Sequence, residues 1–181
     1  MDDLRTERTL LRHWRPEDRD PFAELNADPD VMAFFPSTLS REESDALADR
    51  IEEHFSLNGY GLWAVEAEGA FAGFVGLSWA TFEADFTPAL EIGWRLARPF
   101  WGRGLATEAA RAVLAAGLSV EPSVVSFTAE VNERSWRVMQ RLGMRRELEF
   151  DHPYPGLPER LRRHVLYRAE RQTWIPHSVL D

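Results

Sequence analysis

Two glycines separate an apolar segment from an alanine-rich one in the sequence Trp101-Gly102-Arg103-Gly104-Leu105-Ala106-Thr107. If a strand precedes this loop and a helix follows it, the first N–H groups of the helix lack partners and the helix dipole favours an anion. Glycine also lets the backbone approach phosphate oxygens closely. The loop therefore fits a diphosphate site, although a tight turn that binds nothing has the same pattern.

The two commonest phosphate-binding motifs do not explain this loop. A Walker loop requires a lysine, and all 21 basic residues are arginine. A dinucleotide fingerprint requires glycine or alanine where Thr107 stands, and an acid about 20 residues further on. Glu121 lies near that distance, but beside Pro122 in an expected turn. The Walker loop is therefore excluded, and the dinucleotide fingerprint fits poorly.

Composition narrows the chemistry. Cysteine is absent, which excludes thiolate nucleophiles, disulfides and zinc–thiolate sites. Thirty acidic residues give a net charge of -9, which disfavours nucleic acid and suits a small cationic partner. The five histidines show no metal-binding spacing, so no metal is expected.

The length and composition fit one soluble globular domain over residues 1–181, with 44% apolar and 28% charged residues. No stretch approaches the roughly 20 apolar residues of a membrane span. The first residues lack the layout of a signal peptide. We therefore expect no membrane contact and a cytoplasmic location.

The elements that must position the loop follow from periodicity. Apolar and β-branched runs predict strands at residues 6–13, 62–66, 71–79, 90–96, 124–131, 144–150 and 163–169. Helical spacing and capping signals predict helices after Pro16, at residues 41–57 and 105–118, and after Asn132. The whole is an α/β (α+β) mixed fold. An exposed edge on the final strand would permit a homodimer.

Three features occur in order along the chain: Glu91–Trp94, then Phe100–Ala109, then Asn132–Ser135 together with Leu142–Met144. They resemble the acetyl-CoA-binding core of GNAT-superfamily N-acetyltransferases, most closely that of the RimJ/RimL-like branch. The segment Arg5–Arg12 also resembles the first strand of that branch. The resemblance spans nearly the full chain. It implies a GNAT-like, mostly antiparallel sheet of about six to seven strands, flanked by about four helices.

The resemblance implies that acetyl-CoA is the co-substrate and that Asn132 binds its pantetheine arm, which Trp94 and Leu96 flank. The residues expected around the diphosphate are those of the loop, Trp101, Gly102, Arg103, Gly104, Leu105, Ala106 and Thr107. The superfamily's loop generally opens with Gln or Arg where Trp101 stands. The diphosphate would then depend on backbone amides and on Arg98 or Arg103, which equally fit a solvated basic rim.

The implied reaction is direct attack of an amine on the thioester in a ternary complex, which needs a group to accept the amine's proton. Glu91 is the candidate, and it equally fits a buried acid paired with an arginine. Ser135 would protonate the leaving thiolate, and Asn132 completes the catalytic set; both also fit an ordinary helix N-terminus. The alternative bases are Glu83, Asp85 and Asp151.

The acceptor is expected to be a small-molecule amine or a protein N-terminus. Its pocket is assigned by position in the resembled fold to five aromatic residues that equally fit a core: Phe34, Phe35, Tyr60, Trp79 and Phe86. Two alternatives stay open. The protein transfers another acyl group, or it is a catalytically silent CoA-binding or interaction module.

Overall fold

A computed structural model describes residues 1–175 of the chain. Eight strands form one sheet in the order β1-β2-β3-β4-β5-β6-β8-β7. Neighbouring strands are antiparallel except for β5 and β6, which are parallel. The strands are β1 (Leu4–Arg5), β2 (Thr9–Arg12), β3 (Leu62–Ala67), β4 (Ala70–Ala80), β5 (Ala89–Leu96), β6 (Ser123–Ala129), β7 (Arg145–Asp151) and β8 (Arg163–Glu170).

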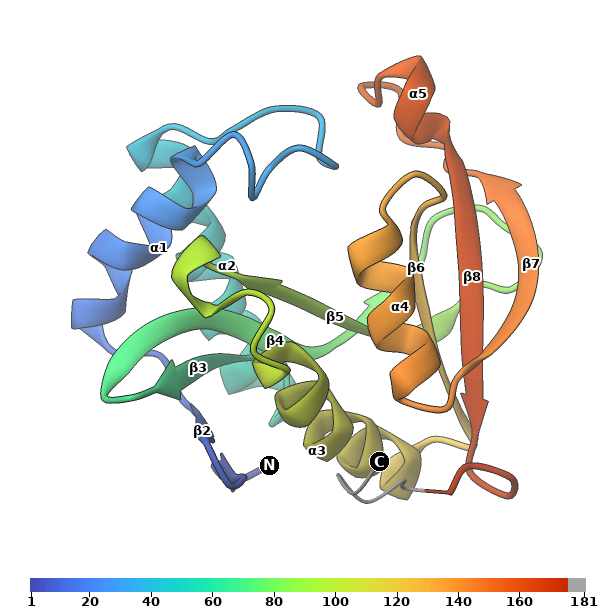
Figure 1. The fold of residues 1–181 in the computed structure, drawn as a ribbon, viewed down its shortest axis with the longest axis horizontal. Helices are drawn as coiled ribbons and strands as arrows, with labels where there is room; N and C mark the ends of the chain where they lie inside the picture. Colours follow the sequence, from blue (N-terminus) through green and yellow to red (C-terminus); the bar gives the residue numbers. More distant parts are fainter. Residues whose placement is uncertain (176–181) are drawn as a thin grey trace.

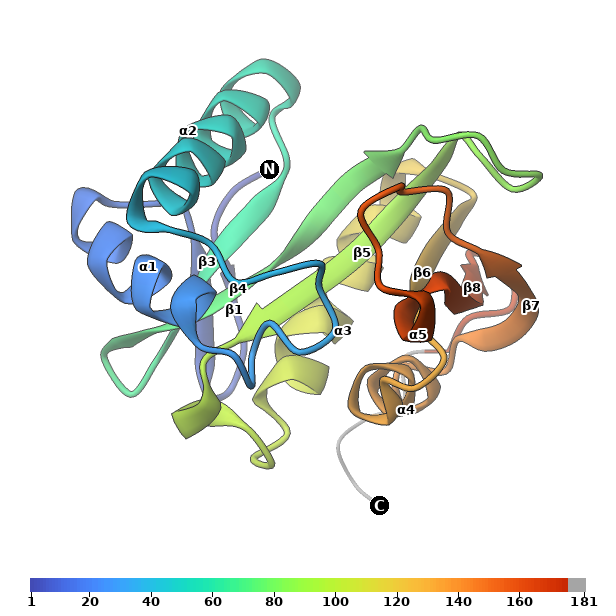
Figure 2. The same cartoon turned by 90° about the horizontal axis from the view of Figure 1, so that it is seen from above.

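Helices cover both faces of the sheet (Figures 1 and 2). Helix α3 contacts β2, β4, β5 and β6 on one face. Helices α1 and α2 pack on the other face, where Phe74 joins their hydrophobic cluster. Phe74 reaches that face, and Val75 the α3 face, because consecutive residues of a strand point in opposite directions. The helices are α1 (Arg19–Ala27), α2 (Arg41–Asn58), α3 (Leu105–Val120), α4 (Glu133–Arg141) and α5 (Glu159–Arg162).

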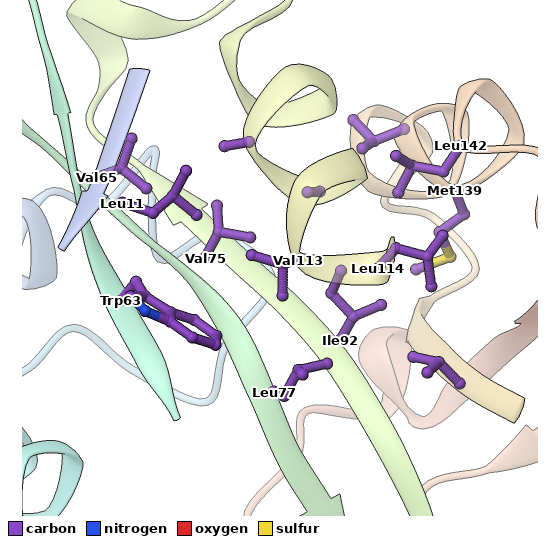
Figure 3. Close-up of a cluster of buried hydrophobic side chains, with 14 of the residues drawn as sticks. Leu11, Trp63, Val65, Val75, Leu77, Ile92, Val113, Leu114, Met139 and Leu142 are labelled. Atoms are coloured by element: carbon purple, nitrogen blue, oxygen red, sulfur yellow. The ribbon is translucent and has the colours of Figure 1, made fainter. Parts of the chain in front are cut away.

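The larger core lies between the sheet and α3 (Figure 3). Val113 and Leu114 of α3 and Val75, Leu77 and Ile92 of the sheet are completely buried. Burying side chains of this kind contributes about 1.5–3 kcal/mol each. The alanine-rich sequence of α3 lets the helix approach the sheet closely, which fixes the loop that precedes it.

Strands β5 and β6 diverge, and Figure 1 shows the resulting separation of the two halves of the sheet. Their ladder has a single residue pair, Glu91 with Val125, whereas the β4–β5 ladder runs from Gly73 and Leu96 to Ala80 and Ala89. Because β5 and β6 separate beyond this point, the rest of β5 presents one backbone edge without a strand partner.

The mixed α/β, mostly antiparallel fold expected from the sequence is confirmed, with eight strands and five helices within residues 1–175. The extra strand arises because a turn at residues 6–8, closed by a hydrogen bond from the Thr6 N–H to the Thr9 carbonyl at 2.9 Å, separates β1 from β2. The extra helix, α5, follows Pro158 in the proline-containing loop.

The expectation of an exposed edge on the final strand is wrong. Strand β8 lies between β6 and β7 and pairs with both, so the described end of the sheet is β7. The sequence places β7 before β8 in the chain, and alternation alone does not reveal that β8 inserts between β6 and β7. Among residues 1–175, no helix combines the length and apolar character that crossing a membrane requires.

Candidate active site

The loop between β5 and α3 presents a row of free backbone N–H groups. Gly102 and Gly104 adopt left-handed conformations, with φ of 71° and 78°, and Gly104 caps α3 without a side chain. Within residues 1–175, the N–H groups of residues 102–107 find no acceptor. A Cβ at Gly102 would meet open space. These N–H groups, at the positive end of a sixteen-residue helix, are suited to bind an anion.

Glu108 anchors the start of α3 to the turn that precedes β2. Its Oε1 accepts from the Thr6 hydroxyl at 2.6 Å and from the Arg8 N–H at 2.7 Å, and its Oε2 accepts from Arg8 Nε at 2.7 Å. Burial raises the pKa of Glu108, but the hydrogen bonds from Thr6 and Arg8 outweigh it and hold that pKa below its ordinary value. Arg8 also donates to the Arg103 carbonyl at 2.8 Å, which fixes the loop.

Trp101 holds the loop against β5. Its indole Nε1 donates to the Leu96 carbonyl at 2.6 Å, and the Arg134 guanidinium carbon lies 4.6 Å from the Trp101 ring centroid. Arg134 makes no ion pair within residues 1–175 and lines the same groove as the loop. The tryptophan therefore positions an arginine beside the free N–H groups, a role that the sequence alone did not reveal.

The expected phosphate partners Arg98 and Arg103 are already engaged. Arg98 donates to Asp28 and to Asp30, each at 2.7 Å. Arg103 pairs with Glu68 and does not line the groove. Of the loop residues named from the sequence, Trp101, Gly102, Gly104, Leu105, Ala106 and Thr107 line the groove, together with Trp94 and Leu96.

The free backbone edge of β5 begins at Trp94. The Ile92 carbonyl faces β6, where it accepts from the Ser126 hydroxyl at 2.8 Å. Because alternate residues of a strand direct their backbone groups to opposite sides, Trp94 is the next residue whose N–H and C=O face the gap. Neither group has a partner within residues 1–175. The Trp94 N–H can thus donate to an oxygen placed between β5 and β6.

Asn132 and Ser135 lie at the start of α4, on the far side of the gap. Asn132 Oδ1 accepts from the Ser135 N–H at 3.4 Å and its Nδ2 donates to the Thr128 hydroxyl at 2.9 Å, so Asn132 acts as a helix N-cap. The Ser135 hydroxyl makes no hydrogen bond within residues 1–175 and lines the groove. Of the two, Ser135 has its polar group free to meet a ligand.

Glu91 lies in an open groove of about 1740 Å³ that also contains the loop, Trp94 and Ser135. It is half-buried, and burial raises its pKa to about 8. No arginine or other donor within residues 1–175 forms a hydrogen bond with the Glu91 carboxyl group. Within this part of the chain, Glu91 is therefore not a buried acid paired with an arginine, the other interpretation that the sequence allowed. The alternative bases Glu83, Asp85 and Asp151 do not line the groove.

Two of the histidines, which show no metal-binding spacing in the sequence, come together in this groove. The rings of His152 and His164 lie 4.9 Å apart, next to Phe127 and Phe150. Burial, and then the charge of His164, lower the pKa of His152 to about 4, and burial lowers the pKa of His164. With a pKa of about 4, His152 is neutral at pH 7. The two histidines meet because β7 and β8 pair antiparallel, so residues twelve apart become neighbours.

The aromatic residues named for the acceptor pocket separate into two groups. Phe34 and Phe35 line the groove. Trp79 donates from Nε1 to the Tyr60 hydroxyl at 2.7 Å, away from the groove, because Ser78 takes the groove-facing position in β4. Phe86 packs against Phe82, Phe127 and Phe150 in an aromatic cluster and does not line the groove.

Residues 8–145 match the family model of the acetyltransferase (GNAT) domain. The chain belongs to this family and is an acetyltransferase. Residues 1–175 contain no group of three or more His, Cys, Asp or Glu side chains arranged to hold a metal ion.

The curated proteins that are similar in sequence include a bacterial and a fungal one. YkkB of Bacillus subtilis (strain 168), described as uncharacterized, is 32% identical over 148 residues, which cover 78% of this chain and 84% of that protein. The FsC-acetyl coenzyme A-N(2)-transacetylase of Aspergillus fumigatus is 30% identical over 195 residues, which cover 95% of this chain and 77% of that enzyme.

Solved structures share the fold. A GNAT-family acetyltransferase from Bacillus anthracis has a TM-score of 0.77 at 23% identity, covering 94% of this chain and 99% of its own. Mycobacterium smegmatis RimJ in complex with CoA-disulfide has a TM-score of 0.75 at 17% identity, and the match covers 94% of this chain and 85% of that chain. A Salmonella typhimurium acetyl transferase that modifies the N-terminal serine of a ribosomal protein has a TM-score of 0.75 at 15% identity. The match covers 91% of this chain and 96% of that enzyme.

Proposed function

We propose that this acetyltransferase moves an acetyl group from acetyl-CoA to a primary amine, by direct attack in a ternary complex. The acceptor is a small-molecule amine or a protein N-terminus, and the chain belongs to the RimJ/RimL-like branch. One observation carries the proposal: Gly102 and residues 104–107, with their free N–H groups, and Glu91, with its unpaired carboxyl, line the same groove. The name of the Aspergillus relative and the reaction of the Salmonella enzyme support an amine acceptor.

Acetyl-CoA fits the groove in two places. The N–H groups of residues 102–107 bind its diphosphate, with Arg134 adding a positive charge beside them. The free edge of β5 from Trp94 supplies backbone partners for the amides of the pantetheine arm, as a neighbouring strand would. Acetyl-CoA is a substrate here, and supplies the activated acetyl group.

The chain's own groups move the protons. An amine must be neutral to attack, and Glu91 accepts its proton directly or through one water molecule. The new C–N bond forms as the C–S bond breaks, and the Ser135 hydroxyl donates a proton to the departing thiolate. Ser135 then regains a proton from solvent, and Glu91 releases the proton of the amine to solvent. The Trp94 N–H stabilises the negative charge that develops on the carbonyl oxygen. With a pKa near 8, Glu91 is partly ionised at neutral pH.

The release of free CoA thiol from acetyl-CoA, measured with a panel of amines, tests this proposal. We expect release that depends on the amine and a product that is heavier by one acetyl group in the mass spectrum. Binding of acetyl-CoA without amine-dependent release would instead indicate a silent CoA-binding module. Turnover of longer acyl-CoA thioesters in preference to acetyl-CoA would indicate transfer of another acyl group.

A further inference from the structure

Arg95 is a partly buried cation that no carboxylate neutralises. It lines the groove from β5, and within residues 1–175 it forms no salt bridge. Its guanidinium carbon lies 4.1 Å from the ring centroid of Phe35 and 5.3 Å from that of Phe74. Burial lowers the pKa of Arg95 to about 10, which leaves the group charged at neutral pH. A cation held between two aromatic rings without a counter-ion is costly unless a ligand supplies the anion.

The nearest polar partner of Arg95 is neutral. Arg95 Nη1 donates to Asn26 Oδ1 at 2.5 Å, and Asn26 is itself fixed because its Nδ2 donates to the Ser44 hydroxyl at 2.9 Å. An aspartate in place of Asn26 would neutralise the guanidinium, but this chain has an amide there. The site therefore orients Arg95 and leaves its charge uncompensated.

One edge of the guanidinium is free. Arg95 Nε is buried and has no hydrogen-bond partner. Nη2 also makes no hydrogen bond within residues 1–175, and it is not among the buried unpartnered atoms, so it keeps some surface in contact with solvent, and the residue lines the groove. Nη2 can donate directly to an anion in the groove, and the buried Nε–H, on the same edge of the guanidinium, can join it in a second hydrogen bond once the side chain shifts to expose it.

The other carboxylates of the groove are already engaged or distant. Asp30 pairs with Arg98, Glu108 accepts from Arg8, and Glu43 accepts from the Ser40 N–H in a capping box. Glu91 is on the same face of β5, but four residues away, which corresponds to about 13 Å along a strand. No carboxylate that lines the groove is thus placed as the counter-ion of Arg95.

We propose that Arg95 binds an anionic group of the acceptor, so that the enzyme selects amines that also carry a carboxylate or phosphate. This inference rests on the proposed amine acetylation. The Cα atoms of Glu91 and Arg95 are about 13 Å apart along the strand, so an acceptor that meets both side chains has its amine and its anion several ångströms apart. That separation is longer than in an α-amino acid and matches a dipeptide or a five-carbon ω-amino acid.

Steady-state kinetics with matched acceptors test the selection. The probes are 5-aminopentanoate, its uncharged amide 5-aminopentanamide, and 4-aminobutylphosphonate. We expect kcat/KM at least 10-fold higher for one of the two anions than for the amide, and the better anion identifies the carboxylate or phosphate class. Equal kcat/KM for all three acceptors would overturn the inference while leaving amine acetylation intact.

Two variants separate binding from a merely structural role. Arg95→Met should remove the preference by raising KM for the anions, with kcat/KM for the amide within about 2-fold of the wild type. Arg50→Met removes an exposed arginine that lines the same groove, and should leave the preference unchanged. Equal loss for anion and amide in Arg95→Met, or loss of the preference in Arg50→Met, would overturn the proposal.

A binding measurement that needs no turnover keeps the inference separate from the proposed function. The Nε–H signal of Arg95, assigned by its absence from the Arg95→Met spectrum, is followed by NMR in the CoA-saturated protein. N-acetyl-5-aminopentanoate or the corresponding phosphonate should shift this signal, and N-acetyl-5-aminopentanamide should not. A shift without any amine-dependent turnover would reject the proposed function alone. An Arg95 signal that responds to none of the probes would reject the anion site.

Discussion

Glu91 and Arg95 lie on the same face of β5, four residues apart, and within residues 1–175 neither side chain is ion-paired despite their opposite charges. Each charge is partly removed from water, and neither is close enough to compensate the other. An arrangement of this kind is expected where a substrate completes the charge balance. It places a proton acceptor and a cation along one groove.

Replacing Glu91 by glutamine removes the proposed base while keeping the side-chain shape. We expect kcat to fall by about 10²- to 10⁴-fold, with acetyl-CoA affinity nearly unchanged. Steady-state kinetics and calorimetry measure the two quantities. The control is Glu24→Gln, which changes an exposed carboxylate of α1. Wild-type turnover in Glu91→Gln would exclude Glu91 as the base.

The raised pKa of Glu91 also predicts how stability depends on pH. Between its ordinary value near 4.5 and about 8, the folded state holds a proton that the unfolded state has released, so stability falls as pH rises across this range. Glu91→Gln should remove this loss and be more stable than the wild type at pH 8, by on the order of 2 kcal/mol. Urea unfolding at pH 5 and pH 8 measures it, and identical pH slopes in both proteins would contradict the assignment.

Ser135→Ala should slow turnover and leave the affinity for CoA almost intact, because the hydroxyl acts on the departing thiolate. Ser119→Ala is the matched control, since Ser119 is an exposed serine at the C-terminal end of α3, whereas Ser135 lies in the first turn of α4. Stopped-flow detection of thiol release follows the step. An unchanged rate in Ser135→Ala would remove its role as an acid.

The histidine pair predicts a loss of stability in acid. Because the folded pKa of His152 is about 4, the unfolded state binds more protons between pH 6.5 and pH 4, and stability falls as pH decreases through that window. His152→Gln should reduce the loss of unfolding free energy between pH 6.5 and pH 4 by about 1–3 kcal/mol. Thermal unfolding from pH 4 to pH 7 measures it, with the exposed His13→Gln as control. An unchanged slope in His152→Gln would show that His152 does not titrate in this way.

Periodicity and turn chemistry predicted most of the fold, because α3, β4 and β5 each bury one continuous apolar face. The Gly102-Arg103-Gly104 loop was also foreseen, since its conformation depends on neighbouring residues. The position of β8 inside the sheet was not predicted, because the order of strands depends on pairing between segments that are distant in the sequence.

Within the site, sequence reasoning identified Glu91, Phe34 and Phe35 as groove candidates, but did not find Arg95 or the histidine pair. Arg95 becomes exceptional only when its partner proves to be the amide of Asn26, and this contact joins residues far apart in the chain. Trp79 faces away because β4 gives the groove position to Ser78. A cytoplasmic location, a single domain and a homodimer stay predictions.

Calorimetric titration of acetyl-CoA into the wild type, Gly104→Asp and Gly69→Asp tests the central claim most directly. Gly104 and Gly69 have φ of 78° and 77°, so both variants introduce similar backbone strain, but only Gly104→Asp puts a carboxylate beside the free N–H groups of the loop. We predict that Gly104→Asp loses measurable affinity and that Gly69→Asp binds like the wild type. Equal affinity in all three proteins would show that this loop does not bind the diphosphate.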